Sequence, residues 1–203
     1  ALDVMGPYEV LARLPDTEVV FVAEHPGLIS NDLGSVSVQA TAGLDDVTSP
    51  DVVLVGGGPG QTANMEDGPV HEWLRQVDRT STWTASVCTG ALILAAAGLL
   101  EGRSATTHWM ALEQLRDHGV TPSTERVVFD GPYVSAAGVS AGIDMALALA
   151  GRLAGDDVAQ TVQLVIEYAP EPPYAAGSVD SAPHDIVERA RTKLSRFDPG
   201  PAR

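Results

Sequence analysis

Short apolar runs alternate with longer helical patterns along most of the chain. Clusters of β-branched residues predict strands at residues 17–23, 35–40, 51–55 and 82–87. The segments between and after these runs predict helices at residues 7–13, 70–79, 89–99, 109–117, 142–153 and 158–168. Strands that alternate with helices favour a mostly parallel sheet with helices on both of its faces.

Two further features of the sequence are a predicted hairpin and a helix near the start of the chain. Residues 126–130 and 132–136 flank Gly131, which predicts a β-hairpin with Asp-Gly at the turn. Pro7 suits the first position of a helix, where its missing N–H costs nothing. No strand precedes this junction, although a parallel sheet needs one of about 5–6 residues. We therefore expect further residues before Ala1 in the natural protein.

The amino-acid composition of the chain changes at about residue 169. The stretch APEPPYAAGSVDSAPHD is rich in Pro, Gly and Ser, which predicts a surface arm before a short helix at residues 186–194. We expect the arm to pack on the domain or on a second subunit, with a role in lining the site as the alternative. A chain of 203 residues with 44% hydrophobic content predicts one domain over residues 1–203.

Composition and charge narrow the range of partners. The longest apolar run, residues 91–100, is far shorter than the roughly 18 residues that span a bilayer, so no membrane segment is expected. The single cysteine excludes an intrachain disulfide, and the chain opens without a signal-peptide pattern, which favours the cytoplasm. The formal net charge of -15 repels a phosphate backbone, so nucleic acid is not an expected partner.

The only cysteine, Cys88, lies where a predicted strand meets an alanine-rich helix. This position is that of a nucleophile elbow, a tight turn that exposes a reactive side chain. The free N–H groups and the dipole of a helix N-terminus stabilise a thiolate, so we expect the pKa of Cys88 to lie below about 8.5. Small neighbours, from Thr89 to Ala91, leave room for a substrate. The alternative is a cysteine that only fills the core.

A glycine run, residues 56–60, follows another buried strand. Glycines at the carboxyl end of a parallel strand let backbone N–H groups point into the crevice where α/β folds bind ligands. Such groups form an oxyanion hole when they face developing negative charge. The run has neither a phosphate-loop ending nor dinucleotide-binding spacing, and a plain turn is the alternative.

Together these motifs resemble the DJ-1/PfpI superfamily, and within it the bacterial isonitrile hydratases. The resemblance rests on residues 2–15, 86–109, 141–147 and 162–183, and so covers nearly the whole chain. It implies an α/β, flavodoxin-like three-layer sandwich with a mostly parallel central sheet. It also implies a homodimer, and a small-molecule substrate with no metal and no cofactor.

The resemblance assigns roles to particular residues. Cys88 matches the nucleophile, Thr89 matches the next residue, whose hydroxyl and N–H face the substrate, and Asp3 matches the acid beside the sulfur. From the residues alone, Asp3 has an alternative role as a helix cap. Gly57 and Gly58 match the family's glycine pair, with glycine in place of the usual preceding proline.

Two further residues are candidates with weaker roles. Glu9 is a possible second acid, although a solvated carboxylate is the ordinary outcome on a first helical turn. In much of the superfamily a histidine lies near the sulfur at the position of His108. We expect His108 to be a wall of the substrate pocket and not the base.

The resemblance implies hydration of an isonitrile to an N-substituted formamide. An isonitrile carbon needs a proton and a nucleophile on the same atom, which Asp3 and Cys88 supply through a thioimidate. Three alternatives stay open. One is a sensor domain of the kind found in AraC-type regulators, another is a glyoxalase- or deglycase-like activity, and the third is a redox-sensing thiol.

Overall fold

The computed structural model describes residues 1–194 of the chain. The contacts group into two compact units, Ala1–Ile166 and a second unit that begins at Glu167. The sequence predicts a C-terminal arm from about residue 169, close to this division. A single domain over residues 1–203 stays a prediction, and its residues 195–203 lie outside the described residues.

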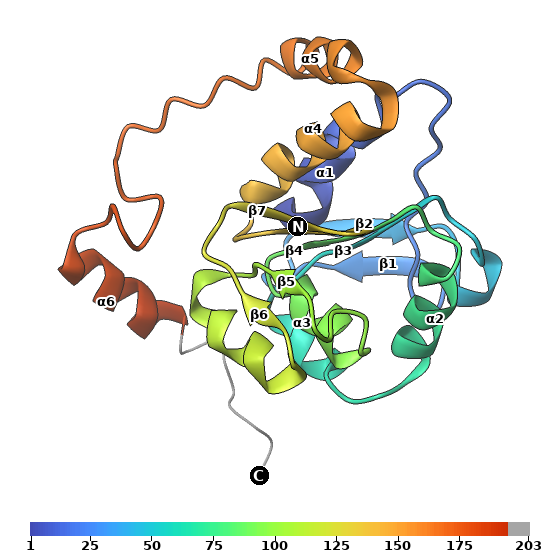
Figure 1. The fold of residues 1–203 in the computed structure, drawn as a ribbon, viewed down its shortest axis with the longest axis horizontal. Coiled ribbons are helices and arrows are strands. Elements are labelled where there is room, and N and C mark those ends of the chain that lie inside the picture. The colour runs from blue at the N-terminus through green and yellow to red at the C-terminus, as the bar shows by residue number, and fades with distance from the viewer. Residues whose placement is uncertain (195–203) are drawn as a thin grey trace. The chain divides into compact units, whose positions relative to one another are not determined.

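Helices and strands alternate through the first unit (Figure 1). The α-helices of this unit are α1 (Leu2–Leu11), α2 (Pro69–Asp78), α3 (Gly90–Ala96), α4 (Ala141–Ala154) and α5 (Asp156–Val165). The strands are β1 (Gly27–Ser30), β2 (Ser37–Ala40), β3 (Val52–Val55), β4 (Trp83–Val87), β5 (Ser104–Ala105), β6 (Thr121–Pro122), β7 (Val127–Asp130) and β8 (Tyr133–Ala136). Three 3-10 helices complete the described elements of this unit: η1 (Leu44–Asp46), η2 (Pro59–Asn64) and η3 (Trp109–His118). The second unit contains α6 (His184–Leu194).

The central sheet has the strand order β3-β4-β8-β7. β3, β4 and β8 run parallel, and β7 pairs antiparallel with β8 through the two-residue turn Gly131–Pro132. The predicted hairpin is thereby confirmed, and Gly131 adopts the positive φ of 60° that such a turn favours. Because the three parallel strands end at the same edge, the segments that follow them meet there.

Helices cover both faces of this sheet, so the unit has three layers. Figure 1 places α1 and α4 on one side of the sheet and α2 and α3 on the other. Alternate strand residues face each layer: Ala85, Val87 and Val134 pack toward α4, whereas Val53 and Tyr133 pack toward α2 and α3.

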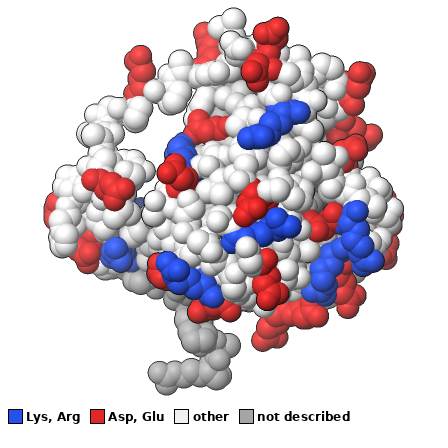
Figure 2. All heavy atoms as spheres, viewed as in Figure 1, with Lys and Arg blue, Asp and Glu red and all other residues white. Residues whose placement is uncertain are grey.

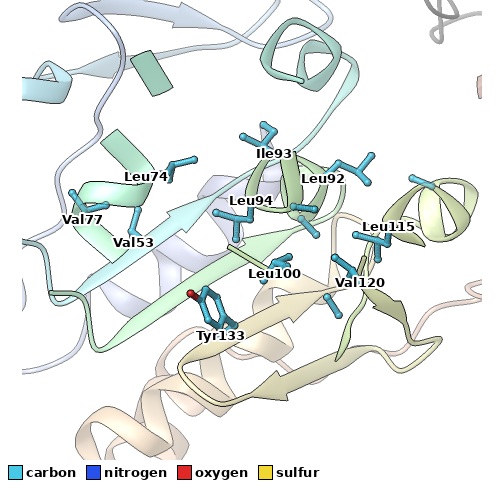
Figure 3. Close-up of a cluster of buried hydrophobic side chains, with 14 residues drawn as sticks. Val53, Leu74, Val77, Leu92, Ile93, Leu94, Leu100, Leu115, Val120 and Tyr133 are labelled. Atoms are coloured by element: carbon cyan, nitrogen blue, oxygen red, sulfur yellow. The ribbon is translucent and has the colours of Figure 1, made fainter. Parts of the chain in front are cut away.

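The layer formed by α2 and α3 holds the largest of the three hydrophobic clusters found among the described residues. Figure 3 shows leucines of both helices, among them Leu74, Leu92 and Leu94, around Val53 and Tyr133. Complete burial of each leucine contributes about 1.5–3 kcal/mol relative to exposure. This packing fixes α3 against the sheet, and with it the turn between β4 and α3.

Several local predictions differ from the structure. The strand predicted at residues 17–23 does not form. This segment makes one isolated parallel bridge, between Val22 and Ala42, and its backbone hydrogen bonds reach only residues 41 and 42. The β1 strand was not predicted, and residues 109–118 form a 3-10 helix. Helix α1 begins at Leu2, so Pro7 lies inside it and cannot donate to the carbonyl of Asp3 four residues earlier.

Candidate active site

Cys88 occupies a strained turn at the carboxyl edge of the sheet, between β4 and α3. Its φ of 57° is left-handed, a conformation that costs a residue with a Cβ about 1–2 kcal/mol. The N–H of Cys88 donates to the carbonyl oxygens of Ala136 and Ala137, at 3.1 and 2.9 Å. These bonds tie the turn to the end of β8. The residue is buried, with 6% of its surface exposed.

Asp3 lies beside the sulfur, although it comes from the other end of the chain. It stands in the first turn of α1 and is buried, with 6% of its surface exposed. Its Oδ2 accepts a hydrogen bond from the N–H of Gly57 at 3.1 Å, and its carboxyl is hydrogen-bonded to the thiol of Cys88. Helix α1 has Ala1 at its N-cap, so Asp3 does not cap the helix. A proton carrier and a nucleophile are therefore in contact.

The surroundings of Cys88 favour the protonated thiol. Burial raises the pKa of Cys88 to about 11, and the negative charge of Asp3 and its hydrogen bond act in the same direction. The backbone N–H groups of Val139 and Thr89 oppose this rise because they donate to the sulfur. The expected lowering of the pKa was wrong, because loss of hydration and a nearby carboxylate outweigh the helix N-terminus.

The glycine run holds the other groups in place. The N–H of Gly57 is bound to Asp3, and the N–H of Gly58 donates to Oγ1 of Thr89 at 2.9 Å. Oγ1 of Thr89 in turn donates to the carbonyl oxygen of Gly58 at 3.3 Å. The sequence predicts that the amides of Gly57 and Gly58 face a substrate, whereas in the structure they position the acid and the threonine.

Close packing explains why these positions are glycine. A Cβ on Gly57 would lie 2.5 Å from both the amide nitrogen and Oγ1 of Thr89. A Cβ on Gly56 would lie 2.6 Å from Cγ2 of Val4, next to Asp3. The loop after β3 therefore touches both the first turn of α1 and the start of α3. A side chain at position 56 would crowd the helix that carries Asp3.

His108 lies near the acid, but its described contacts go elsewhere. Its Nδ1 accepts from the N–H of Met110 at 3.4 Å, and its ring lies against Trp109 at 5.6 Å between centroids. Burial lowers the pKa of His108, and the charge of Asp3 acts in the opposite direction. Within residues 1–194, no hydrogen bond is found between His108 and Cys88. The neutral, half-buried ring suits the predicted wall position.

Glu9 does not reach the site. Its side chain is exposed and forms an ion pair of 2.7 Å with Arg13, which lies four residues later and just beyond the end of α1. A spacing of i,i+4 commonly brings two such side chains together. Asp3 is thus the acid that the structure brings to Cys88.

Two site residues had no signal in the sequence. Thr107 donates from its hydroxyl to the carbonyl oxygen of Cys88 at 2.7 Å. Val139 adopts φ 32°, which is an outlier for a β-branched residue, and its N–H points at the sulfur. No spacing in the sequence predicts either contact, because each depends on how β8 and the segment after β5 pack against β4.

The described residues contain neither a metal-binding cluster nor a membrane-spanning helix. No group of three or more His, Cys, Asp or Glu side chains in residues 1–194 is arranged to bind a metal ion. No helix in that range is both long and apolar enough to cross a membrane. On the face in Figure 2, acidic side chains are spread over the surface with basic ones between them.

A three-layer α/β fold with a cysteine elbow and an adjacent acid defines a class of proteins. The chain belongs to the DJ-1/PfpI family, whose model matches residues 1–152. It is 43% identical to isonitrile hydratase from Pseudomonas putida over 194 residues, which cover 96% of this chain and 85% of that protein. The predicted family and the predicted α/β fold with a mostly parallel sheet are thereby confirmed.

Other relatives differ in how much of their length matches. The crystal structure of a ThiJ/PfpI family protein from Pseudomonas syringae superposes with a TM-score of 0.92 at 31% identity, covering 97% of this chain and 81% of that one. The HTH-type transcriptional regulator CdhR from Pseudomonas aeruginosa is 33% identical over 68% of this chain, which is 40% of the regulator. Sequences similar to this chain thus occur in an isonitrile hydratase and in part of a transcriptional regulator.

The contact between Asp3 and Cys88 predicts the effect of removing the charge. In Asp3→Asn the negative charge beside the sulfur is lost, so the pKa of Cys88 is expected to fall below about 11. More thiolate is then present at any given pH, and iodoacetamide should alkylate Cys88 faster at neutral pH. The pH dependence of the alkylation rate measures this shift. Glu9→Gln, the same change on the same helix, is expected to leave the profile in place.

Proposed function

We propose that this chain is an isonitrile hydratase, which adds water to an isonitrile and releases an N-substituted formamide. The observation that carries the proposal is the buried contact between the Asp3 carboxyl and the Cys88 thiol. Identity of 43% to an isonitrile hydratase over nearly the whole chain supports the choice of substrate. The substrate is a small molecule that carries an isonitrile group.

The first half of the reaction adds the thiol across the isonitrile carbon. Since the pKa of Cys88 is raised to about 11, the shared proton is on sulfur before the substrate binds. Asp3 accepts that proton and passes it to the terminal carbon while the sulfur attacks the same carbon. One S–H bond breaks, one C–H and one C–S bond form, and the product is a thioimidate, R–N=CH–S–Cys88.

The second half returns the enzyme to its starting state. Water adds to the thioimidate carbon as the Asp3 carboxylate takes one of its protons and passes it to the nitrogen, which gives R–NH–CH(OH)–S–Cys88. The C–S bond then breaks as the C–O bond of the adduct becomes a C=O bond, the hydroxyl proton passes to the sulfur, and R–NH–CHO leaves. The sum is one isonitrile plus one water to one formamide.

Backbone amides support the sulfur in both halves. The N–H groups of Thr89 and Val139 donate to it, and they stabilise negative charge as the S–H bond breaks and again as the C–S bond breaks. Gly57 holds the carboxyl of Asp3 toward the sulfur. The amides are fixed in the folded chain, so no reorganisation is needed during the reaction.

The purified chain is expected to convert cyclohexyl isocyanide to N-cyclohexylformamide. Proton NMR of the mixture follows the formyl hydrogen as it appears and the isonitrile as it disappears. Methylglyoxal in a parallel reaction tests the carbonyl-hydrating alternative, which uses the same thiol. Turnover of methylglyoxal without turnover of the isonitrile would contradict the proposal.

A sensor role is the second candidate, because the chain is 33% identical to part of a transcriptional regulator. A sensor would bind a ligand without consuming it. The same NMR samples separate the two roles, since bound but unchanged isonitrile indicates a sensor and free formamide indicates an enzyme. The homodimer and the cytoplasmic location stay predictions.

A further inference from the structure

Thr107 is a buried residue that contacts the backbone of Cys88 at the turn between β4 and α3. Only 1% of its surface is exposed, and its hydroxyl donates to the carbonyl oxygen of Cys88 at 2.7 Å. The other donor to that oxygen is the N–H of Ala91, at the longer distance of 3.3 Å. The threonine hydroxyl is therefore the shorter of the two hydrogen bonds that hold this buried carbonyl.

The carbonyl of Cys88 shares a planar peptide group with the N–H of Thr89. In a trans peptide the C=O and the N–H point in opposite directions, so fixing one fixes the other. That N–H is one of the two backbone donors to the sulfur. A hydrogen bond to the carbonyl also polarises the peptide and strengthens its N–H as a donor. The hydroxyl of Thr107 thus acts on the sulfur through one peptide group.

Thr107 is itself held in place by the sheet. The N–H of the preceding residue, Thr106, donates to Oγ of Ser135 at 2.9 Å, and both residues are buried. Ser135 lies on β8, beside Ser86 of β4 in the parallel register. The same strand ends at Ala136, whose carbonyl accepts from the N–H of Cys88. The N–H of Cys88 is therefore held by β8 directly, and its carbonyl is held through Thr107, whose neighbour Thr106 is bound to β8.

We infer that Thr107 is a positioning residue, whose hydroxyl orients the Cys88–Thr89 peptide so that its N–H faces the sulfur. This inference rests on the proposed role of Cys88 as the nucleophile. The strained φ of 57° at Cys88 makes such a restraint necessary, since an unrestrained turn relaxes away from the left-handed region. Without the hydroxyl, the amide no longer stabilises charge on the sulfur during attack.

The test compares three variants of the full chain. Thr107→Val keeps the shape of the side chain and removes the hydroxyl, and Thr107→Ser keeps the hydroxyl. Thr84→Val is the matched control, because Thr84 is also buried on the sheet and donates to Asp78 Oδ1 at 2.7 Å. It lies four residues before Cys88, about 13 Å away at 3.3 Å per strand residue. The melting temperature of each variant is recorded.

Alkylation of Cys88 by iodoacetamide and isonitrile hydration are then measured. In Thr107→Val we expect both the alkylation rate and kcat to fall about tenfold, with little change in KM. Thr107→Ser should restore most of both, and Thr84→Val should lower the melting temperature alone. An alkylation rate in Thr107→Val that is unchanged, or faster than in the parent chain, overturns the inference.

The hydrogen bond to the Cys88 carbonyl can also be followed by NMR, which does not depend on the activity of the variant. Because Cys88 is the only cysteine, labelling cysteine at its carbonyl carbon gives one NMR signal. Loss of the hydrogen bond is expected to move that signal upfield in Thr107→Val and leave it unmoved in Thr107→Ser. A signal unmoved by valine would overturn the inference. If the parent chain is alkylated normally but hydrates no isonitrile, the proposed function fails and the positioning role is still judged by the alkylation rates.

Discussion

Cys88→Ala is expected to reduce formamide production to the uncatalysed rate, and Asp3→Asn to reduce kcat by about 10²–10⁴-fold. Alanine cannot form the thioimidate, so no covalent route is left. Asparagine retains an oxygen that can accept from Gly57, but it cannot take the thiol proton or deliver it to carbon. The formyl signal in proton NMR measures both losses.

The expected results for Cys88 and Asp3 need a matched comparison. Glu9→Gln makes the same carboxylate-to-amide change on α1, at an exposed residue paired with Arg13, and should retain full activity. Mass spectrometry of Asp3→Asn after mixing with substrate tests whether the adduct still forms. Full activity in Asp3→Asn, with a melting temperature near that of the parent, would assign proton transfer to another group.

Gly90→Ala is expected to destabilise the fold severely. Gly90 is the first residue of α3, and a Cβ there would lie 2.2 Å from the carbonyl oxygen of Val55. Both are backbone positions of packed elements, so neither can move without separating α3 from β3. The expected cost exceeds about 4 kcal/mol, a large part of a total stability of about 5–15 kcal/mol. Soluble yield and thermal unfolding measure the loss.

Gly60→Ala is the control for this effect. Gly60 is exposed in η2, and a Cβ there meets no atom within 4 Å. The change is expected to alter stability by less than about 0.5 kcal/mol. A Gly90→Ala variant that melts like Gly60→Ala would show that α3 packs less closely on β3 than the structure describes.

The sequence predicted the parts of the site that lie at junctions of regular elements. Cys88 follows a β-branched run and precedes an alanine-rich helix, and the glycine run follows another buried strand. Both positions follow from the rule that parallel strands end at one edge of a sheet. The contact between Cys88 and Asp3 came from resemblance alone, because no local pattern joins two residues that are so far apart in the chain.

The sequence could not give the electrostatic balance at the sulfur. A helix N-terminus lowers a thiol pKa, and this rule led to the expected thiolate. The sign at Cys88 depends on how deeply the residue is buried and on the side chain beside it, and both are tertiary properties. The strained φ of Val139 and the hydrogen bond from Thr107 were unpredictable for the same reason.

Many of the contacts around Cys88 join distant parts of the chain, and this bears on how the protein folds during synthesis. Gly57 and Asp3 are 54 positions apart, Gly58 and Thr89 are 31 apart, and the amide of Val139 comes still later than Thr107. A ribosome releases these segments in order, so the sulfur of a nascent chain lacks the cover that β8 and the turn after it provide until those segments emerge. Oxidants therefore have their best access to this thiol during synthesis, before the last parallel strand has joined the sheet.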